Sequence, residues 1–357
     1  MSKLKLTEEV WGRSPAGRDV RRFTLVSPTV QVAVMSYGGV ITSVRTPDRR
    51  GEWDEITLGY DEAAPYFDRT TASFFGALIG RYGNRIAGGR FSLGAQAYRL
   101  PLNGGPNTLH GGPRGFDQHD WDARAEATDD ALSVTLTRRS PDGEEGFPGA
   151  LDVSVTYRLD ADGTLDLLYR AVTDRPTVVN LTNHTYWNLR GDRDVLDHVL
   201  ELPAARFVPV RADMIPTGDL TGVAGTPLDF RTPQPVGARI GGDHEQLRLA
   251  GGYDHTFVLE GEPDAGGLRR AAHLSEPGLG RTLEVWTSEP GVQFYSGNFL
   301  TGQPGRGARP YPRRWGLCLE TQHYPDSPNQ PQFPSTRLDP GEAYRSHTRY
   351  RFGIAPD

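Results

Sequence analysis

Hydrophobic and polar residues alternate along most of this chain, with the period of two expected for a strand that has one buried face. The pattern is clearest from Ala131 to Val172. Its apolar positions are Leu132, Val134 and Leu136, then Leu151, Val153, Val155 and Tyr157, then Leu165, Leu167 and Tyr169. Turn residues separate the sets at Ser140–Gly143 and Asp160–Gly163. The pattern therefore predicts antiparallel strands packed on a core through one face.

Further strand-like segments follow the same pattern over the whole chain. They are Val30–Val34, Asp54–Tyr60, Asn180–Leu189, Leu200–Pro209, Gly251–Leu259, Arg281–Thr287, Gly291–Asn298, Gly316–Gln322 and Ala343–Phe352. Helix is expected only in short pieces, first within Asp61–Ser73. The 357 residues include 43 glycines and 28 prolines, which favour many short strands joined by turns. With no repeat and no linker, we expect one all-β domain spanning residues 1–357.

The composition of the chain argues against several classes of function. A net charge of −6 and an isoelectric point near 5.9 argue against a surface for nucleic acids or anionic membranes. Apolar runs stay below the roughly 20 residues that span a bilayer, and Met1–Glu9 lacks the apolar segment of a signal peptide. The single cysteine, Cys318, excludes an intrachain disulfide and fits a reducing compartment. We therefore expect a cytoplasmic protein without a membrane partner.

The segment Asn180–Leu189 carries the first candidate site. Read as one strand, its two faces differ in character. One face presents Asn180, Thr182, His184, Tyr186 and Asn188. A polar row with a titratable histidine at its centre suits a concave site for a ligand rich in hydroxyl groups. The alternative is a hydrogen-bonded histidine packed within a sheet.

A second group of polar residues follows the glycine-rich segment Phe75–Phe91. Asn84 and Arg85 could present several donors to sugar oxygens from a glycine-lined turn. A structural salt bridge is the alternative for Arg85. The glycines do not indicate a phosphate loop, because the segment has no Gly-Lys-Ser/Thr and no helical pattern after it.

The loop Asn103–Asp122 is long, polar and rich in chemistry-bearing side chains, which favours a functional role. It contains His110. A metal site built from His110, Asp117 and His119 is conceivable. Their spacing matches no compact zinc pattern and no cysteine is near, so we expect no metal.

Three further candidates lie on late strands. Glu320 stands in the apolar strand Leu317–Gln322, and a glutamate there is rarely buried without a partner or a function. Asp254 enters a strand at its polar end, where it could accept two hydroxyls or cap its own turn. Gln293 shares a strand face with Tyr295.

These residues suit proton transfer on a neutral polyol. The chain lacks a Gly-x-Ser-x-Gly nucleophile motif, a dinucleotide fingerprint and a metal cluster. Acid–base catalysis needs one acid and one base of different pKa, and His184 and Glu320 have reference pKa values of about 6.5 and about 4.3. A neighbouring carboxylate, Glu320 or Asp254, is expected to help keep His184 protonated.

Seven motifs in order resemble the aldose 1-epimerase (galactose mutarotase) family. They are Asn84-Arg85-Ile86, Thr108–Gly112, Ser140–Gly146, Asn180–Leu189, Gly252–His255, Pro290–Asn298 and Leu319–Gln322. The resemblance spans almost the whole chain. It implies a large antiparallel β-sandwich with a few short helices and a shallow open cleft.

The resemblance also implies roles for individual residues. The family's general acid falls on His184, its general base on Glu320 and its second active-site histidine on His110. Sugar-binding roles fall on Asn84, Arg85, Asp254 and Gln293. The implied substrate is a free aldohexose such as galactose or glucose, with no cofactor and with a monomer or homodimer as the assembly. Tyr82-Gly83 and His323-Tyr324 depart from the family pattern, and we expect them to affect which sugars fit.

Three other functions fit parts of the pattern. A glycoside hydrolase could pair Asp254 with Glu320. A sugar-binding module would keep the fold without needing the His184–Glu320 pair. A hexose-6-phosphate epimerase would require a basic cluster at the cleft.

Overall fold

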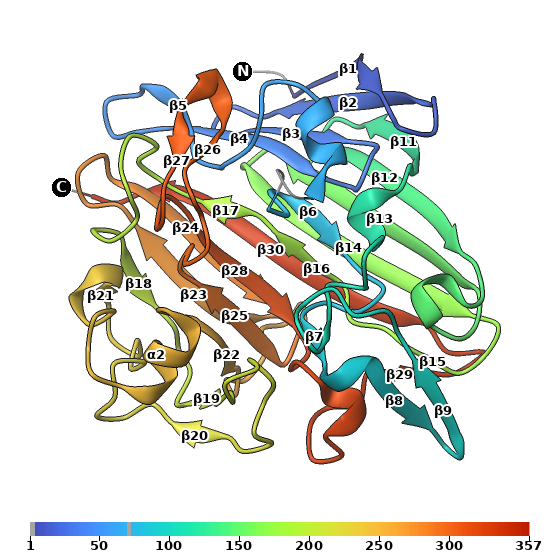
Figure 1. The fold of residues 1–357 in the computed structure, drawn as a ribbon. Helices are drawn as coiled ribbons and strands as arrows, with labels where there is room; N and C mark the ends of the chain where they lie inside the picture. The colour runs from blue at the N-terminus through green and yellow to red at the C-terminus, as the bar shows by residue number, and fades with distance from the viewer. Residues whose placement is uncertain (1–3, 70–72, 357) are drawn as a thin grey trace.

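Antiparallel sheets dominate the computed structural model, which describes residues 4–69 and 73–356 (Figure 1). The largest sheet has nine strands in the order β11-β12-β13-β14-β30-β24-β23-β18-β21. Their bounds are β11 (Asp122–Ala127), β12 (Ala131–Ser140), β13 (Leu151–Asp160), β14 (Thr164–Thr173), β30 (Tyr344–Ile354), β24 (Arg281–Thr287), β23 (Arg269–Ser275), β18 (Val199–Glu201) and β21 (Gln234–Pro235). All its neighbouring strands pair antiparallel.

A second sheet of six strands has the order β17-β28-β25-β22-β19-β20. Its strands are β17 (Tyr186–Trp187), β28 (Leu317–Gln322), β25 (Gly291–Tyr295), β22 (Asp254–Val258), β19 (Arg206–Val208) and β20 (Thr221–Gly222). One face packs on the large sheet: the Trp187 ring lies 5.2 Å from that of Tyr350, and the hydroxyls of Thr321 and Thr348 are hydrogen-bonded. The predicted all-β sandwich is confirmed.

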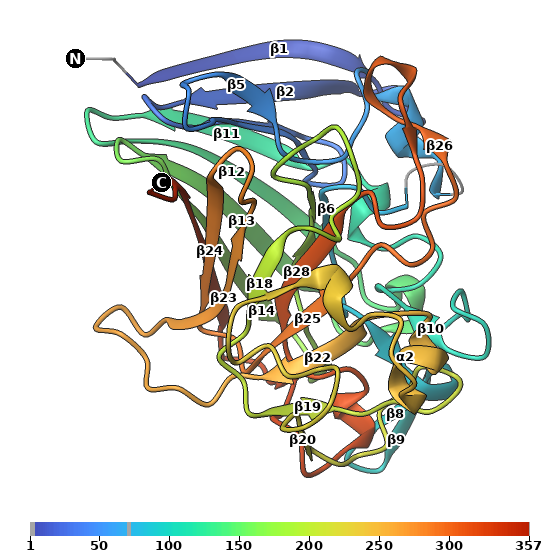
Figure 2. The ribbon, with the colours of Figure 1, turned by 90° about the vertical axis from the view of Figure 1, so that its left-hand side faces the viewer.

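The N-terminal strands form a third sheet, β1 (Lys5–Arg13), β2 (Asp19–Val26), β3 (Gln31–Met35), β4 (Ile41–Pro47) and β5 (Trp53–Glu55). It lies at one end of the sandwich, at the top of both views (Figures 1 and 2). Phe23 and Leu25 of β2 share one hydrophobic core with Leu132 and Val134 of β12. Each fully buried side chain of this kind contributes about 1.5–3 kcal/mol.

Short pairs and turns complete the chain. The two-stranded sheets are β6–β16 (Ala77–Ile79, Thr182–His184), β7–β10 (Arg85–Ile86, Thr108–Leu109), β8–β9 (Arg90–Leu93, Gln96–Arg99), β15–β29 (Thr177–Val178, Arg337–Leu338) and β26–β27 (Gln303–Pro304, Pro310–Tyr311). Helical pieces are short: α2 (Glu245–Ala250) and 3₁₀ turns at Ala64–Phe67, Ala87–Gly89, Phe116–Gln118, Glu144–Gly146, Val236–Ala238, Arg306–Ala308 and Ser327–Asn329. No helix in the described residues is long and apolar enough to cross a membrane.

The expectation of one strand over Asn180–Leu189 is wrong. The segment forms β16 and β17, which break at Thr185 and pair with different strands, β6 and β28. The Asn183 Oδ1 atom accepts hydrogen bonds from the Thr185 N–H (3.1 Å) and hydroxyl (2.5 Å). These local bonds compete with the sheet ladder and turn the chain.

The short helical piece expected within Asp61–Ser73 is confirmed. Within Asp61–Ser73 the structure has the 3₁₀ turn at Ala64–Phe67, and residues 70–72 lie outside the described residues. The strand expected over Asp54–Tyr60 shortens to the end of β5 and one isolated bridge between Thr57 and Trp187.

Candidate active site

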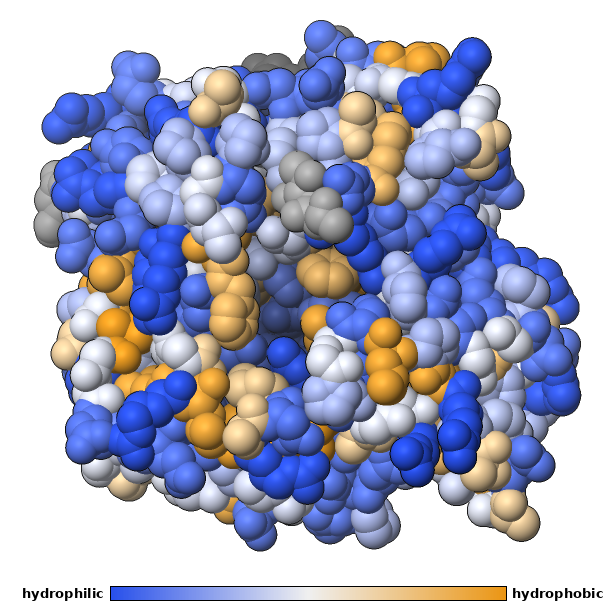
Figure 3. Space-filling view, viewed as in Figure 1, coloured by the Kyte–Doolittle hydropathy of each residue, from blue (hydrophilic) through white to orange (hydrophobic). Residues whose placement is uncertain are grey.

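A cavity of about 280 Å³ opens on the face of the six-stranded sheet that points away from the large sheet. Six of the seven predicted site residues line it: Asn84, Arg85, His110, His184, Asp254 and Glu320. Figure 3 shows this face of the molecule hollowed near its centre, with hydrophobic and hydrophilic side chains around the hollow. The structure thus gathers residues from five separate parts of the chain.

His184 and Glu320 meet on the floor of the cavity. His184 ends β16, which is a partner of β6, whereas Glu320 lies in the middle of β28. The His184 Nε2 atom is 3.7 Å from the Glu320 Oε1 atom, and the two residues are 5 % and 2 % exposed. The other carboxylate oxygen, Oε2, is buried without a hydrogen-bond partner among the described residues. Glu320 therefore has an unused acceptor at the cavity.

Burial shifts the pKa values of both groups away from the charged forms. It lowers the pKa of His184 to about 4, opposed by the residue's own backbone carbonyl. It raises the pKa of Glu320 well above its usual range, reinforced by Asp254 and opposed by Arg85. The expectation that Glu320 or Asp254 helps keep His184 protonated is wrong for this cavity, because burial of the imidazolium sets the lowered pKa.

His110 is held in one orientation by Asn84. The Asn84 backbone N–H donates to the His110 Nδ1 atom (3.1 Å), so the neutral ring carries its hydrogen on Nε2. Burial, followed by the charges of His184, Arg85 and Arg69, lowers the pKa of His110 well below its usual value. His110 is therefore a neutral hydrogen-bond donor at the cavity wall.

The geometry does not favour a metal ion here. Ligand atoms of His110, His184 and Glu320 lie within 4.8 Å of one another. The His110 nitrogen that faces the cavity carries a hydrogen, whereas a metal ligand needs a lone pair. Of the alternative set, the Asp117 carboxylate is bound by Arg69 (2.8 Å from Nε to Oδ2), and His119 contacts the Arg114 carbonyl.

Arg85 and Asp254 present charge to the cavity. In the described part of the chain the Arg85 guanidinium makes no ion pair, and its Nη1 donates to the Asn84 Oδ1 atom (3.4 Å). The structural salt bridge considered for Arg85 is therefore absent there. Burial raises the pKa of Asp254, opposed by Arg85 and by a hydrogen bond from Gln293.

Gln293 does not line the cavity. Its Nε2 donates to Asp254 Oδ1 (2.7 Å), and its Oε1 accepts from the Thr256 hydroxyl (2.5 Å). Both ends of the amide are therefore occupied within the sheet, and Gln293 fixes the orientation of Asp254. A direct contact with sugar stays a prediction.

Several aromatic wall residues were not predicted. Phe74, Tyr295 and Phe299 line the cavity, and the Phe74 ring lies 4.8 Å from that of His110 and 5.7 Å from that of His184. Phe74 has a φ of 61°, which no sequence pattern signals. The shared face of Gln293 and Tyr295 was the one available hint.

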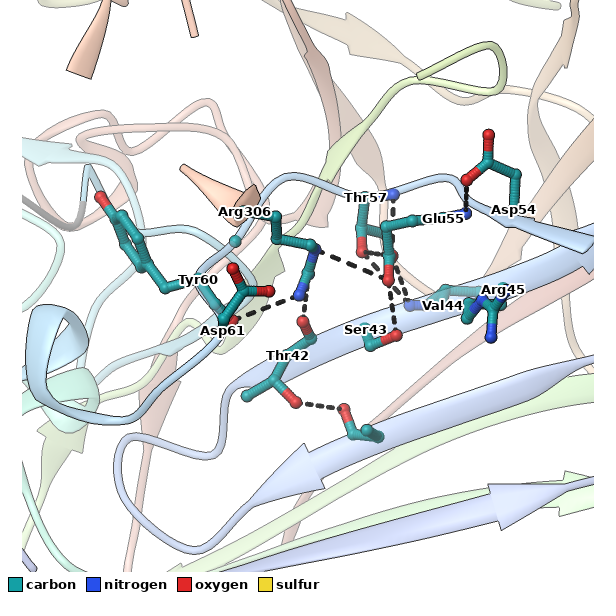
Figure 4. A network of polar contacts seen from close by, with 12 residues as sticks. Thr42, Ser43, Val44, Arg45, Asp54, Glu55, Thr57, Tyr60, Asp61 and Arg306 are labelled. Carbon is teal, nitrogen blue, oxygen red and sulfur yellow. Dashed lines mark hydrogen bonds and ion pairs between the residues drawn. The ribbon is translucent and has the colours of Figure 1, made fainter. Parts of the chain in front are cut away.

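The wall that includes Phe299 and Leu300 leads into the β26–β27 hairpin, which Arg306 anchors (Figure 4). The Arg306 guanidinium donates to the carbonyls of Thr42 and Tyr60 and lies 3.6 Å from the Glu55 Oε2 atom. At the other side of the hairpin, Gln303 donates to the Ser73 hydroxyl at the cavity rim (2.9 Å). The hairpin thus joins the N-terminal sheet to the wall of the site.

Comparisons with known proteins identify similar sequences and structures over nearly the whole chain. The family model described as aldose 1-epimerase matches residues 21–351. The galactose mutarotase of Bos taurus is 42 % identical over 356 residues, covering 99 % of this chain and 100 % of that protein. The aldose 1-epimerase of Escherichia coli (strain K12) is 40 % identical over 343 residues, covering 95 % and 97 %. A galactose 1-epimerase structure from Lactobacillus acidophilus NCFM has a TM-score of 0.87 at 30 % identity, covering 99 % and 100 %.

The fold and these relatives define the class of protein, an isomerase that interconverts aldose anomers. The chain belongs to the aldose 1-epimerase family.

Proposed function

We propose that this enzyme interconverts the α and β anomers of free aldohexoses, galactose and glucose, with His184 as general acid and Glu320 as general base. The observation that carries the proposal is the 3.7 Å approach of the buried His184 Nε2 to Glu320 Oε1 in a cavity lined by polar and aromatic side chains. An acid and a base at this spacing can reach the ring oxygen and the anomeric hydroxyl of one pyranose.

The reaction conserves protons. Glu320 removes the proton of the anomeric hydroxyl while His184 protonates the ring oxygen; the bond between C1 and the ring oxygen breaks and C1 becomes a carbonyl. Rotation about C1–C2 presents the other carbonyl face, and the same groups act in reverse to close the opposite anomer. The protein ends with the protons it began with, so the cycle requires no cofactor. Each positioned acid or base contributes about 10²–10⁴-fold.

The starting state needs a charged His184–Glu320 pair, which burial opposes. One feature of the free protein and two contacts of the bound sugar favour it. Arg85 lowers the pKa of Glu320, and the anomeric hydroxyl supplies a donor to the carboxylate. The ring oxygen accepts from His184 Nε2. Substrate binding therefore assembles the reactive protonation state.

The remaining polar groups bind the substrate and stabilise charge. Asp254 accepts sugar hydroxyls, Asn84 and Arg85 donate to sugar oxygens, and the His110 Nε2–H supports the negative charge that develops on the carbonyl oxygen.

Polarimetry of freshly dissolved α-D-galactose and α-D-glucose tests the proposal. We expect the rotation to reach its usual endpoint faster with enzyme, and the ratio of rates to give the preferred sugar. No acceleration in folded protein that binds these sugars would favour a binding module. Release of sugar from aryl glycosides would favour a hydrolase, and acceleration limited to hexose 6-phosphates a phosphosugar epimerase.

A further inference from the structure

The two nitrogens of His184 face different groups of one strand. Nε2 faces Glu320, whereas Nδ1 lies 3.5 Å from the Cys318 Sγ atom. Cys318 and Glu320 are two residues apart on β28 and share the face directed away from the large sheet. One strand therefore places a group at each nitrogen of the imidazole.

The rest of the ring is enclosed by aromatic side chains. The ring centroid of His184 lies 5.1 Å from that of Tyr186, 5.2 Å from that of His110 and 5.7 Å from that of Phe74. The titratable and charged groups around it come from every element that packs there: Cys318 and Glu320 (β28), Asp254 (β22), Tyr295 (β25), Tyr186 (β17), Arg85 (β7), His110 and Arg69. Among these side chains Cys318 is the one whose polar atom meets Nδ1, and the backbone carbonyl of His184 is a further acceptor at the ring.

Proton exchange at Nε2 demands a particular tautomer. An imidazolium that gives up its Nε2 proton leaves a neutral ring with the hydrogen on Nδ1. If the hydrogen moved to Nε2 instead, that atom could not take the proton back when the ring closes. Nδ1–H is buried, so it needs an acceptor close by.

We propose that Cys318 is a positioning residue whose sulfur accepts the Nδ1–H of His184 and so confines proton exchange to Nε2. The inference rests on the proposed role of His184 as proton donor. Burial raises the pKa of the Cys318 thiol well above its usual value, so the sulfur stays a neutral, weak acceptor. A weak acceptor fixes the tautomer without stabilising the imidazolium strongly, which keeps His184 acidic enough to protonate a ring oxygen.

Imidazole ¹⁵N NMR of the wild-type enzyme tests the tautomer directly and does not depend on turnover. We expect neutral His184 to carry its hydrogen on Nδ1. A neutral Nε2–H ring in the wild type would overturn the inference, whether or not the enzyme proves to be a mutarotase. Absence of mutarotation with an Nδ1–H ring would instead count against the proposed function alone.

Variants of Cys318 test the role of the sulfur. Cys318→Ala should populate the Nε2–H tautomer and lower kcat about two- to tenfold, the effect of one lost hydrogen bond, with KM unchanged. Its pH optimum should move to lower pH, because loss of the acceptor lowers the pKa of His184 further. Cys318→Ser retains an acceptor at Nδ1 and should restore the tautomer and most of kcat.

Thr348→Ala is the matched control for a purely structural effect. Thr348 is equally buried and bonds to the opposite face of the same strand through Thr321. We expect it to lower the melting temperature without changing the tautomer or the pH optimum. If Cys318→Ala keeps the Nδ1–H tautomer and the wild-type kcat, the sulfur does not position His184 and the inference is wrong.

Discussion

Asn84 and His110 are joined by two hydrogen bonds that run in opposite directions. The His110 N–H donates to the Asn84 carbonyl (3.0 Å), and the Asn84 N–H donates to the His110 ring (3.1 Å). Both residues have a positive φ, 60° and 50°. Strained backbone of this kind persists only where the surroundings fix it, and here it holds the His110 Nε2–H toward the cavity.

Removing that donor should therefore slow turnover. We expect His110→Ala to lower kcat by about 10²-fold or more, as loss of a preorganised donor to a developing oxyanion does. His119→Ala, in the same loop but bonded to the Arg114 carbonyl, is the control and should keep the wild-type rate. Equal rates for the two variants would remove His110 from the reaction.

Gln293 should act on substrate binding through Asp254. Its hydrogen bond lowers the pKa of Asp254, so Gln293→Leu should raise that pKa. As the pH is lowered, the Asp254 carboxylate of the variant is protonated earlier than that of the wild type. KM should therefore begin to increase at a higher pH in the variant, while kcat changes less. Measuring KM against pH for both proteins checks this. Thr256→Val, which removes only the bond to the Gln293 oxygen, should give a smaller shift.

His198 links folding to pH outside the site. Its Nε2 accepts the Leu189 N–H (2.9 Å), and burial lowers its pKa to about 4. Between the unfolded value of about 6.5 and this folded value, the unfolded chain binds more protons, so the free energy of unfolding falls as pH falls. His198→Gln should flatten that dependence. At about 1.4 kcal/mol for each unit of pKa shift, the unfolding free energy that the wild type loses on acidification and the variant keeps is up to a few kcal/mol. Urea unfolding at several pH values measures it; an unchanged slope would contradict it.

Arg306 should influence the site through the β26–β27 hairpin. Arg306→Met removes the bonds to Thr42 and Tyr60 and should loosen the wall formed by Phe299 and Leu300. We expect KM to rise several-fold, with a smaller change in kcat and a lower melting temperature. Arg309→Met is the matched control, because Arg309 is exposed on the same hairpin and its guanidinium bonds only to the Gly191 carbonyl in the described structure. Identical KM values for the two variants would show that the anchor does not shape the site.

The sequence predicts the regular strands well and the local breaks poorly. Alternation predicts the inward faces of β12, β13 and β14 correctly, because every second residue along a strand points to the same, buried face. The break at Thr185 depends on an Asn183 side chain that bonds the backbone, which alternation does not record. The single-domain organisation and the monomer or homodimer stay predictions.

The sequence likewise predicts some residues of the candidate site and misses others. His184 and Glu320 are recognisable because a titratable residue in an apolar strand is costly without a use. Phe74 and Arg69 lie outside the strands that alternation predicts, and only the tertiary fold brings them to the cavity. The hydrogen bonds of Gln293 with Asp254 and Thr256 likewise depend on the pairing of β22 with β25.

The acid–base assignment is tested most directly by polarimetry of α-D-galactose with the wild-type enzyme, Glu320→Gln and His184→Asn under one condition. Loss of either group should lower kcat by about 10²–10⁴-fold, while binding of galactose, measured by calorimetry, persists. The account predicts rapid mutarotation by the wild type and nearly the spontaneous rate for both variants. A Glu320→Gln enzyme that keeps the wild-type rate would contradict it.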